Sequence, residues 1–89
     1  SIMDMVILSV PEGDDKPIKY PLVFEKSKLV LINKIDALPY FDFNMEKCIS
    51  NIKYRNKDAT IIPISAKTGE NIELVAKYFK DTIAAWRKN

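Results

Sequence analysis

The stretch Leu29–Asp36 reads LVLINKID and joins four apolar residues directly to a polar tetrapeptide. A continuous apolar run of this length predicts a strand that is buried on both faces, as in parallel sheets. Two further runs are similar, Met3–Val10 (MDMVILSV) and Ala59–Ile64 (ATIIPI). Because helical patterns separate the three runs, the sequence predicts an α/β fold with three parallel strands and right-handed crossovers.

The segments between and after these strands carry the signals of helices. Pro21 suits the first turn of a short helix predicted over 20–26. Asp42 or Asn44 is placed to cap a second helix over about 44–55. Its apolar residues recur three and four positions apart, which predicts one buried face: Met45, Cys48, Ile49 and Ile52. A long helix predicted over 71–87 shows the same spacing: Ile72, Val75, Phe79, Ile83 and Trp86. Polar segments with Pro or Gly predict loops over 11–17 and 67–69 and a turn over 37–41.

Composition limits the function that these 89 residues can have. A hydrophobic content of 47% suits one small packed domain, and a net charge of +2 without a basic stripe argues against nucleic acid as a partner. No apolar stretch approaches the roughly 20 residues that span a bilayer, and no signal peptide is visible. Cys48 is the single cysteine, which agrees with a reducing compartment. We therefore expect a cytoplasmic protein without a membrane partner.

Two scarce residue types exclude several kinds of catalysis. The chain has no His, so it contains neither a Ser-His-Asp nor a Cys-His arrangement and offers no imidazole to a metal. A phosphate-binding P-loop needs two glycines five positions apart, followed by Lys and Ser or Thr. The two glycines here, Gly13 and Gly69, lie far apart. The chain therefore contains no P-loop of its own and no dinucleotide-binding glycine turn.

Polar residues follow two of the predicted strands at the point where each strand ends. Asn33-Lys34-Ile35-Asp36 follows the second strand and Ser65-Ala66-Lys67 follows the third. Because the carboxyl ends of parallel strands lie at one edge of a sheet, both segments can converge on one ligand.

The first segment has the chemistry to recognise guanine. The Asp36 carboxylate presents two acceptors side by side, and guanine presents its N1–H and 2-amino donors in the same way, so the pairing is bidentate and charge-assisted. Adenine lacks both donors and would leave a desolvated carboxylate unpaired. We expect the Lys34 stem to lie along one face of the base and Lys67 to cover the other face.

The remaining residues of the two segments are expected to support this recognition. Ala66 is small, so its backbone N–H can approach the guanine carbonyl. Asn33 and Ser65 are expected to brace the loops rather than read the base. A polar loop without a ligand is the alternative for the tetrapeptide alone, whereas its combination with Ser65-Ala66-Lys67 favours the guanine site. Asp14 and Asp15 lack further ligands at calcium-site spacing and are interpreted as a solvated acidic loop.

The two segments together resemble the fourth and fifth sequence elements of the P-loop GTPases. The stretch Leu8–Pro21 (LSVPEGDDKPIKYP) is similar to the segment that precedes the guanine motif in the HypB family. The match continues through Asn33–Phe43 (NKIDALPYFDF) and Ile64–Glu70 (ISAKTGE), and the whole resemblance runs from about Met3 to Phe79. HypB proteins are GTPases that assist nickel insertion into hydrogenase and, in some bacteria, urease.

This resemblance implies that residues 1–89 are a partial G domain, the C-terminal, guanine-recognition half of a Rossmann-like three-layer fold without the P-loop, switch and metal-site segments. It implies GTP or GDP as the ligand, with Mg and nickel or zinc bound only by the full-length parent. The implied partners are a hydrogenase precursor, accessory nickel-delivery proteins and a second copy in a GTP-dependent homodimer. We expect the 89 residues alone not to hydrolyse GTP, because the P-loop Lys and Mg supply the electrostatics of that reaction.

The resemblance also bears on two further positions, Lys19 and Ala37. Lys19 lies in the family-specific stretch KPIKYP, and the resemblance implies that it helps to place nucleotide or the partner subunit, the alternative being an exposed residue at a helix start. Ala37 stands where the family usually has Leu, in a region that contributes to dimerisation.

Two other functions compete with this interpretation. One is another P-loop GTPase, such as a ribosome-assembly type, which the stretch GDDKPIKYP disfavours. The other is a non-catalytic oligomerisation or interaction module that uses the first strand and the last helix.

Overall fold

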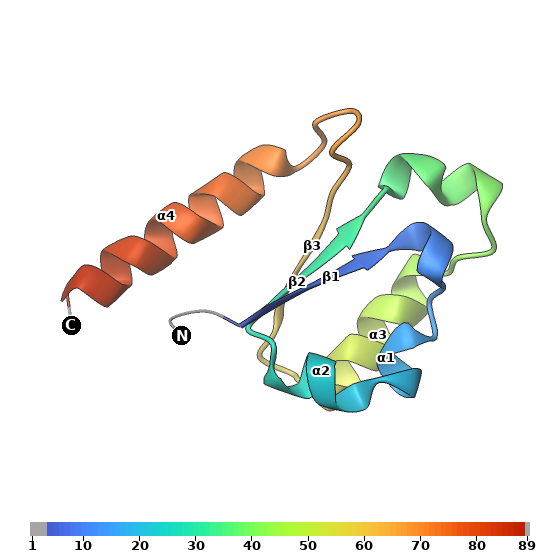
Figure 1. Ribbon diagram of the computed structural model, residues 1–89, viewed down its shortest axis with the longest axis horizontal. Helices are drawn as coiled ribbons and strands as arrows, with labels where there is room; N and C mark the ends of the chain where they lie inside the picture. The colour runs from blue at the N-terminus through green and yellow to red at the C-terminus, as the bar shows by residue number, and fades with distance from the viewer. Residues whose placement is uncertain (1–3, 89) are drawn as a thin grey trace.

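A parallel three-stranded sheet forms the centre of the computed structural model, which describes residues 4–88 except for the side chain of residue 88. The strands lie in the order β1-β2-β3 (Figure 1), with bounds β1 Met5–Ser9, β2 Leu29–Asn33 and β3 Thr60–Pro63. The α-helices are α1 Lys16–Lys19, α2 Pro21–Lys26, α3 Met45–Arg55 and α4 Ile72–Lys88. Two 3-10 helices are η1 Val10–Glu12 and η2 Ile35–Tyr40. The predicted α/β class with three parallel strands is confirmed.

The first core lies between the sheet and the helices α1, α2 and α3, which share one side of it in Figure 1. Its buried residues come from strands and helices along most of the chain: Leu8, Val10, Phe24, Val30, Ile32, Cys48, Ile52 and Ala59. Cys48 and Ile52 are fully buried, and Met45 and Ile49 pack against the cluster, which confirms the predicted face of the middle helix.

Helix α4 covers the opposite face of the sheet only in part. Its residues Val75, Tyr78 and Phe79 pack against a second cluster. That cluster comes from β2, β3 and the residue that follows β3: Leu29, Leu31, Ile62 and Ile64. In Figure 1 the second half of α4 extends beyond the strands, and Ile83 and Trp86 are exposed.

Strand β1 is therefore an edge strand with one uncovered face. Met5 and Ile7 pair in register with Leu29 and Leu31, but α4 does not reach them, and they are 43% and 50% exposed. The prediction that the first strand is buried on both faces is wrong for these 89 residues. Met3, at the start of that predicted strand, lies outside the described residues.

Local signals set several element ends. Pro21 is the first residue of α2, as predicted. Asn44, and not Asp42, caps α3, because the Asn44 side chain accepts a hydrogen bond from the Lys47 N–H at 3.0 Å. The predicted loop over 11–17 instead contains most of η1 and the start of α1, and the predicted turn over 37–41 overlaps η2, which ends at Tyr40. Within residues 4–88, no helix is long and apolar enough to cross a membrane.

Burial of Cys48 generates a prediction about its reactivity. Desolvation, with a smaller contribution from the Asp14 charge, raises the pKa of the Cys48 thiol from 9.0 to about 12. We expect iodoacetamide to label the native chain slowly, with no rise in rate through pH 9, because the thiolate is the nucleophile. In guanidinium chloride the thiol regains its ordinary pKa, so labelling becomes fast and rises through pH 9.

Intact-mass spectrometry at several pH values measures both labelling rates. Since the folded pKa is raised, the contribution of this thiol to stability is complete below pH 9 and declines as the pH rises toward 12. Rapid native labelling that rises through pH 9 would contradict the buried position of Cys48.

Candidate functional site

The parallel pairing of the strands places their carboxyl ends side by side. Ser9 pairs with Asn33 across β1 and β2, and the Ile64 N–H donates to the Ile32 carbonyl at 2.7 Å beyond the last pair of β2 and β3. The Ile35 N–H then donates to the Ile64 carbonyl at 3.2 Å. The two polar segments therefore begin next to each other, as their positions after the strands predicted.

A buried hydroxyl holds the Asp36 carboxylate. Ser65 is 0% exposed, and its Oγ donates to Asp36 Oδ1 at 2.7 Å while it accepts from the Thr68 N–H at 3.1 Å. No described residue donates to Asp36 Oδ2. The carboxylate is therefore fixed through one oxygen and keeps acceptor capacity for another donor.

The Asn33 side chain links the two segments. Its Oδ1 accepts from the Lys34 N–H at 2.8 Å and from the Ala66 N–H at 3.4 Å. The second bond is long and therefore weak. These contacts agree with the expectation that Asn33 braces the loops, and they give the Ala66 N–H a weak partner within the chain.

Lys34 has a backbone conformation that the sequence did not reveal. Its φ of 65° and ψ of 38° lie in the left-handed region, which costs a residue with a β-carbon roughly 1–2 kcal/mol. The neighbouring peptides hold this conformation, because the Ala37 N–H donates to the Lys34 carbonyl at 2.9 Å. The Lys34 side chain is exposed. No signal in the sequence marks this position, since left-handed residues are usually Gly, Asn or Asp.

The third strand is followed by a tight turn that includes Lys67. The Gly69 N–H donates to the Ser65 carbonyl at 2.8 Å, and Gly69 has a φ of 84°, where a side chain would be strained. Lys67 is exposed in this turn. Asn71 directly precedes α4, and its Nδ2 donates to the Pro63 carbonyl at 2.8 Å.

Lys19 lies apart from the other six predicted site residues. Its Nζ pairs with Asp15 Oδ2 at 3.3 Å, and both side chains are largely exposed. No hydrogen bond or ion pair in the described part of the chain joins it to the loops after β2 and β3. Its role at the nucleotide or at a partner subunit stays a prediction.

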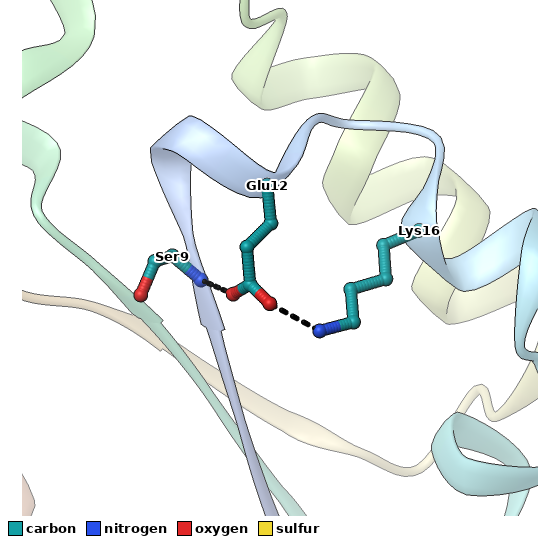
Figure 2. A network of polar contacts seen from close by, with 3 residues as sticks. All are labelled: Ser9, Glu12 and Lys16. Atoms are coloured by element: carbon teal, nitrogen blue, oxygen red, sulfur yellow. Dashed lines mark hydrogen bonds and ion pairs between the residues drawn. The ribbon is translucent and has the colours of Figure 1, made fainter.

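The segment after β1 contains a polar network that sequence reasoning missed, drawn in Figure 2. Glu12 Oε2 accepts from the Ser9 N–H at 2.6 Å, and Glu12 Oε1 pairs with the Lys16 ammonium. The hydrogen bond from Lys16 and that from Ser9 lower the pKa of Glu12, with a smaller contribution from the charge of Lys34. The sequence contained a signal for this contact, because Ser9 and Glu12 are three positions apart, which is the spacing of a helix capping box.

The acidic residues of the next turn have partners within the protein. Asp14 Oδ2 accepts from the Asn44 N–H at 2.7 Å, which ties this turn to the start of α3, and Asp15 pairs with Lys19. Over residues 4–88, no three His, Cys, Asp or Glu side chains are grouped so that they could hold a metal ion.

The Ser65 hydroxyl generates a stability prediction. Ser65→Ala removes the bond to Asp36 and leaves the Thr68 N–H without its acceptor, so we expect the free energy of unfolding to fall by about 1–3 kcal/mol. Urea denaturation measures this change. The matched control is Ser50→Ala, on the exposed face of α3, where little or no loss is expected. Equal effects of the two substitutions would contradict the bracing role of Ser65.

The left-handed backbone of Lys34 generates the opposite prediction. Lys34→Gly relieves the strain, so the free energy of unfolding should stay constant or rise by up to about 1 kcal/mol. Lys67→Gly is the control in the neighbouring turn, where φ is not positive, and it should lower stability by up to about 1 kcal/mol. Equal losses in both variants would show that residue 34 is not strained.

The chain is similar to known proteins in both sequence and fold. The chain is 48% identical to the hydrogenase maturation factor HypB of Escherichia coli K12 over 69 residues, 78% of this chain and 24% of that protein. It matches 91% of its length to the crystal structure of HypB from Helicobacter pylori in complex with nickel, with a TM-score of 0.86 and 32% identity, and covers 38% of that chain. No family model matches the sequence.

A second crystal structure, that of HypB from Archaeoglobus fulgidus, matches 85% of this chain and 41% of its own, with a TM-score of 0.82 and 33% identity. The chain thus spans about a quarter of the length of the Escherichia coli relative. Since sequence and fold both match over most of its length, the chain belongs to the HypB family and corresponds to one segment of those proteins.

Proposed function

We propose that these residues form the guanine-base pocket of a GTP-binding protein. The observation that carries this proposal is the Asp36 carboxylate, held through Oδ1 by the buried Ser65 hydroxyl at the carboxyl edge of a parallel sheet. Its other oxygen is available, so Oδ2 and the remaining lone pair of Oδ1 can accept the guanine N1–H and 2-amino donors together.

The residues around Asp36 complete the proposed pocket. The Lys34 and Lys67 side chains are both exposed at the strand ends and are proposed to cover opposite faces of the base. The Ala66 N–H donates to Asn33 over a long distance of 3.4 Å, so it can share its hydrogen with the guanine carbonyl at little cost. In this role Asn33 and Ser65 orient the loops and do not touch the base.

The activity of the whole protein is part of the same proposal. Relatives of this chain are hydrogenase maturation factors, and one solved relative binds nickel. We propose that the longer protein containing this segment binds GTP or GDP with Mg, hydrolyses GTP, and assists nickel delivery to a hydrogenase precursor with its accessory proteins as a homodimer. The 89 residues contribute base recognition and are proposed to lack hydrolysis on their own.

Asp36→Asn tests the proposed pairing. An amide offers one acceptor and one donor, which match the N1–H and the 2-carbonyl of xanthine rather than the two donors of guanine. We expect the variant of the longer protein to lose affinity for GDP by at least about 100-fold and to gain preference for XDP, since an unmatched buried polar group is costly. Calorimetric titration with GDP, XDP and ADP measures the preference.

The matched control is Asp42→Asn, at an exposed position just beyond η2. This variant should bind GDP as the unmodified protein does and should reject XDP. If Asp36→Asn still prefers GDP, or if the unmodified protein binds ADP as well as GDP, Asp36 does not read guanine and the proposed function is wrong.

A further inference from the structure

The Ser9–Glu12–Lys16 network lies beside the proposed guanine site, although nothing in the pairing of Asp36 with a base requires it (Figure 2). Ser9 is the residue of β1 that pairs with Asn33, and Lys34 directly follows Asn33. Since Glu12 Oε2 accepts from the Ser9 N–H, its carboxylate is anchored at the strand end that adjoins the Lys34 backbone. The 3-10 helices η1 and η2 are in contact with each other.

Lys34 combines a constrained backbone with a side chain that makes no ion pair in the described part of the chain. Its backbone is fixed in the left-handed region, but its side chain is exposed and has no ion pair among the described residues. A free lysine side chain has many rotamers, and ordering one on binding costs conformational entropy. A fixed negative charge on the β1 side would restrict the Lys34 ammonium before a ligand arrives.

We propose that Glu12 is a positioning residue of the nucleotide site, which attracts the Lys34 ammonium toward the end of β1 so that the Lys34 stem lies across one face of the base. This inference rests on the proposed guanine site. Glu12 itself touches neither the base nor the reacting atoms. Hydrogen bonds from Lys16 and Ser9 lower the pKa of the Glu12 carboxyl, and the positive charge of Lys34 makes a smaller contribution in the same direction.

Glu12→Gln separates charge from structure. The Gln amide oxygen can still accept from the Ser9 N–H, as Glu and Gln both do in a capping box, so the end of β1 keeps its fold. The variant loses the negative charge and, with it, the ion pair to Lys16. Because the Lys34 stem contacts the ring and not its substituents, the variant should weaken GDP and IDP binding by the same factor, about 2- to 10-fold. Asp36→Asn, in contrast, should change the ratio of the two affinities.

A double-substitution cycle identifies the residue through which Glu12 acts. Lys34→Met keeps an apolar stem of similar length and removes the ammonium, so Glu12→Gln should have no further effect on GDP affinity in that background. Lys16→Met is the control, because Lys16 is the lysine in direct contact with Glu12. In the Lys16→Met background, Glu12→Gln should still weaken GDP binding by the same factor.

The measurement is calorimetric titration of the longer protein with GDP, IDP and ADP, together with urea unfolding of each variant without nucleotide. Equal loss from Glu12→Gln with Lys or Met at position 34 would overturn the inference, as would no loss at all or a loss that disappears with Lys16→Met. Each of these outcomes leaves the guanine site intact if GDP is still preferred over ADP. If the unmodified protein does not prefer GDP over ADP, the proposed function itself is wrong.

Discussion

The central strand β2 pairs in parallel with a neighbour on each side, and the other features of the molecule follow from this pairing. Its four apolar residues are buried on both faces of the sheet, where they contribute to two separate cores. Parallel pairing also brings three strand ends to one edge. The polar segments after β1, β2 and β3 are neighbours for that reason alone, although they are distant in the sequence.

Side-chain hydrogen bonds then convert neighbouring loops into a defined site. The Ser65 hydroxyl fixes Asp36 and the Asn33 amide bridges to Ala66, so each loop holds a group of the other. The backbone of Lys34 is strained where its side chain is proposed to meet a ligand. Strain at such a position is typical of sites whose surroundings determine a conformation that the residue would not choose.

One face of the sheet is covered only in part. Met5 and Ile7 are exposed on the face that α4 covers over β2 and β3, and β1 is an open edge. Exposed apolar edges of this kind favour association with another strand or helix. The chain spans 24% of the Escherichia coli relative. Base recognition is thus proposed for this segment, and phosphate chemistry for residues outside it.

The sequence by itself determined the fold class and the convergence of the two polar segments at one edge of the sheet. The three apolar runs, the Pro at the start of α2 and the helical spacing of Cys48 and Ile52 are local signals, and local signals suffice for element type. The positions of Asp36 and Ser65 after successive strands likewise sufficed to predict that they meet.

Only the tertiary structure decided which surfaces are covered and which charges are neighbours. An apolar strand has the same sequence whether a helix covers it or not, so the exposure of Ile7 depends on where α4 ends. The left-handed conformation of Lys34 is held locally by the bond from the Ala37 N–H, and the next residue, Ile35, donates to the Ile64 carbonyl after β3. No preference of lysine reveals this conformation. The position of Glu12 at the end of β1, where Ser9 pairs with Asn33, depends on the register of β1 against β2, a long-range pairing that neither segment encodes alone.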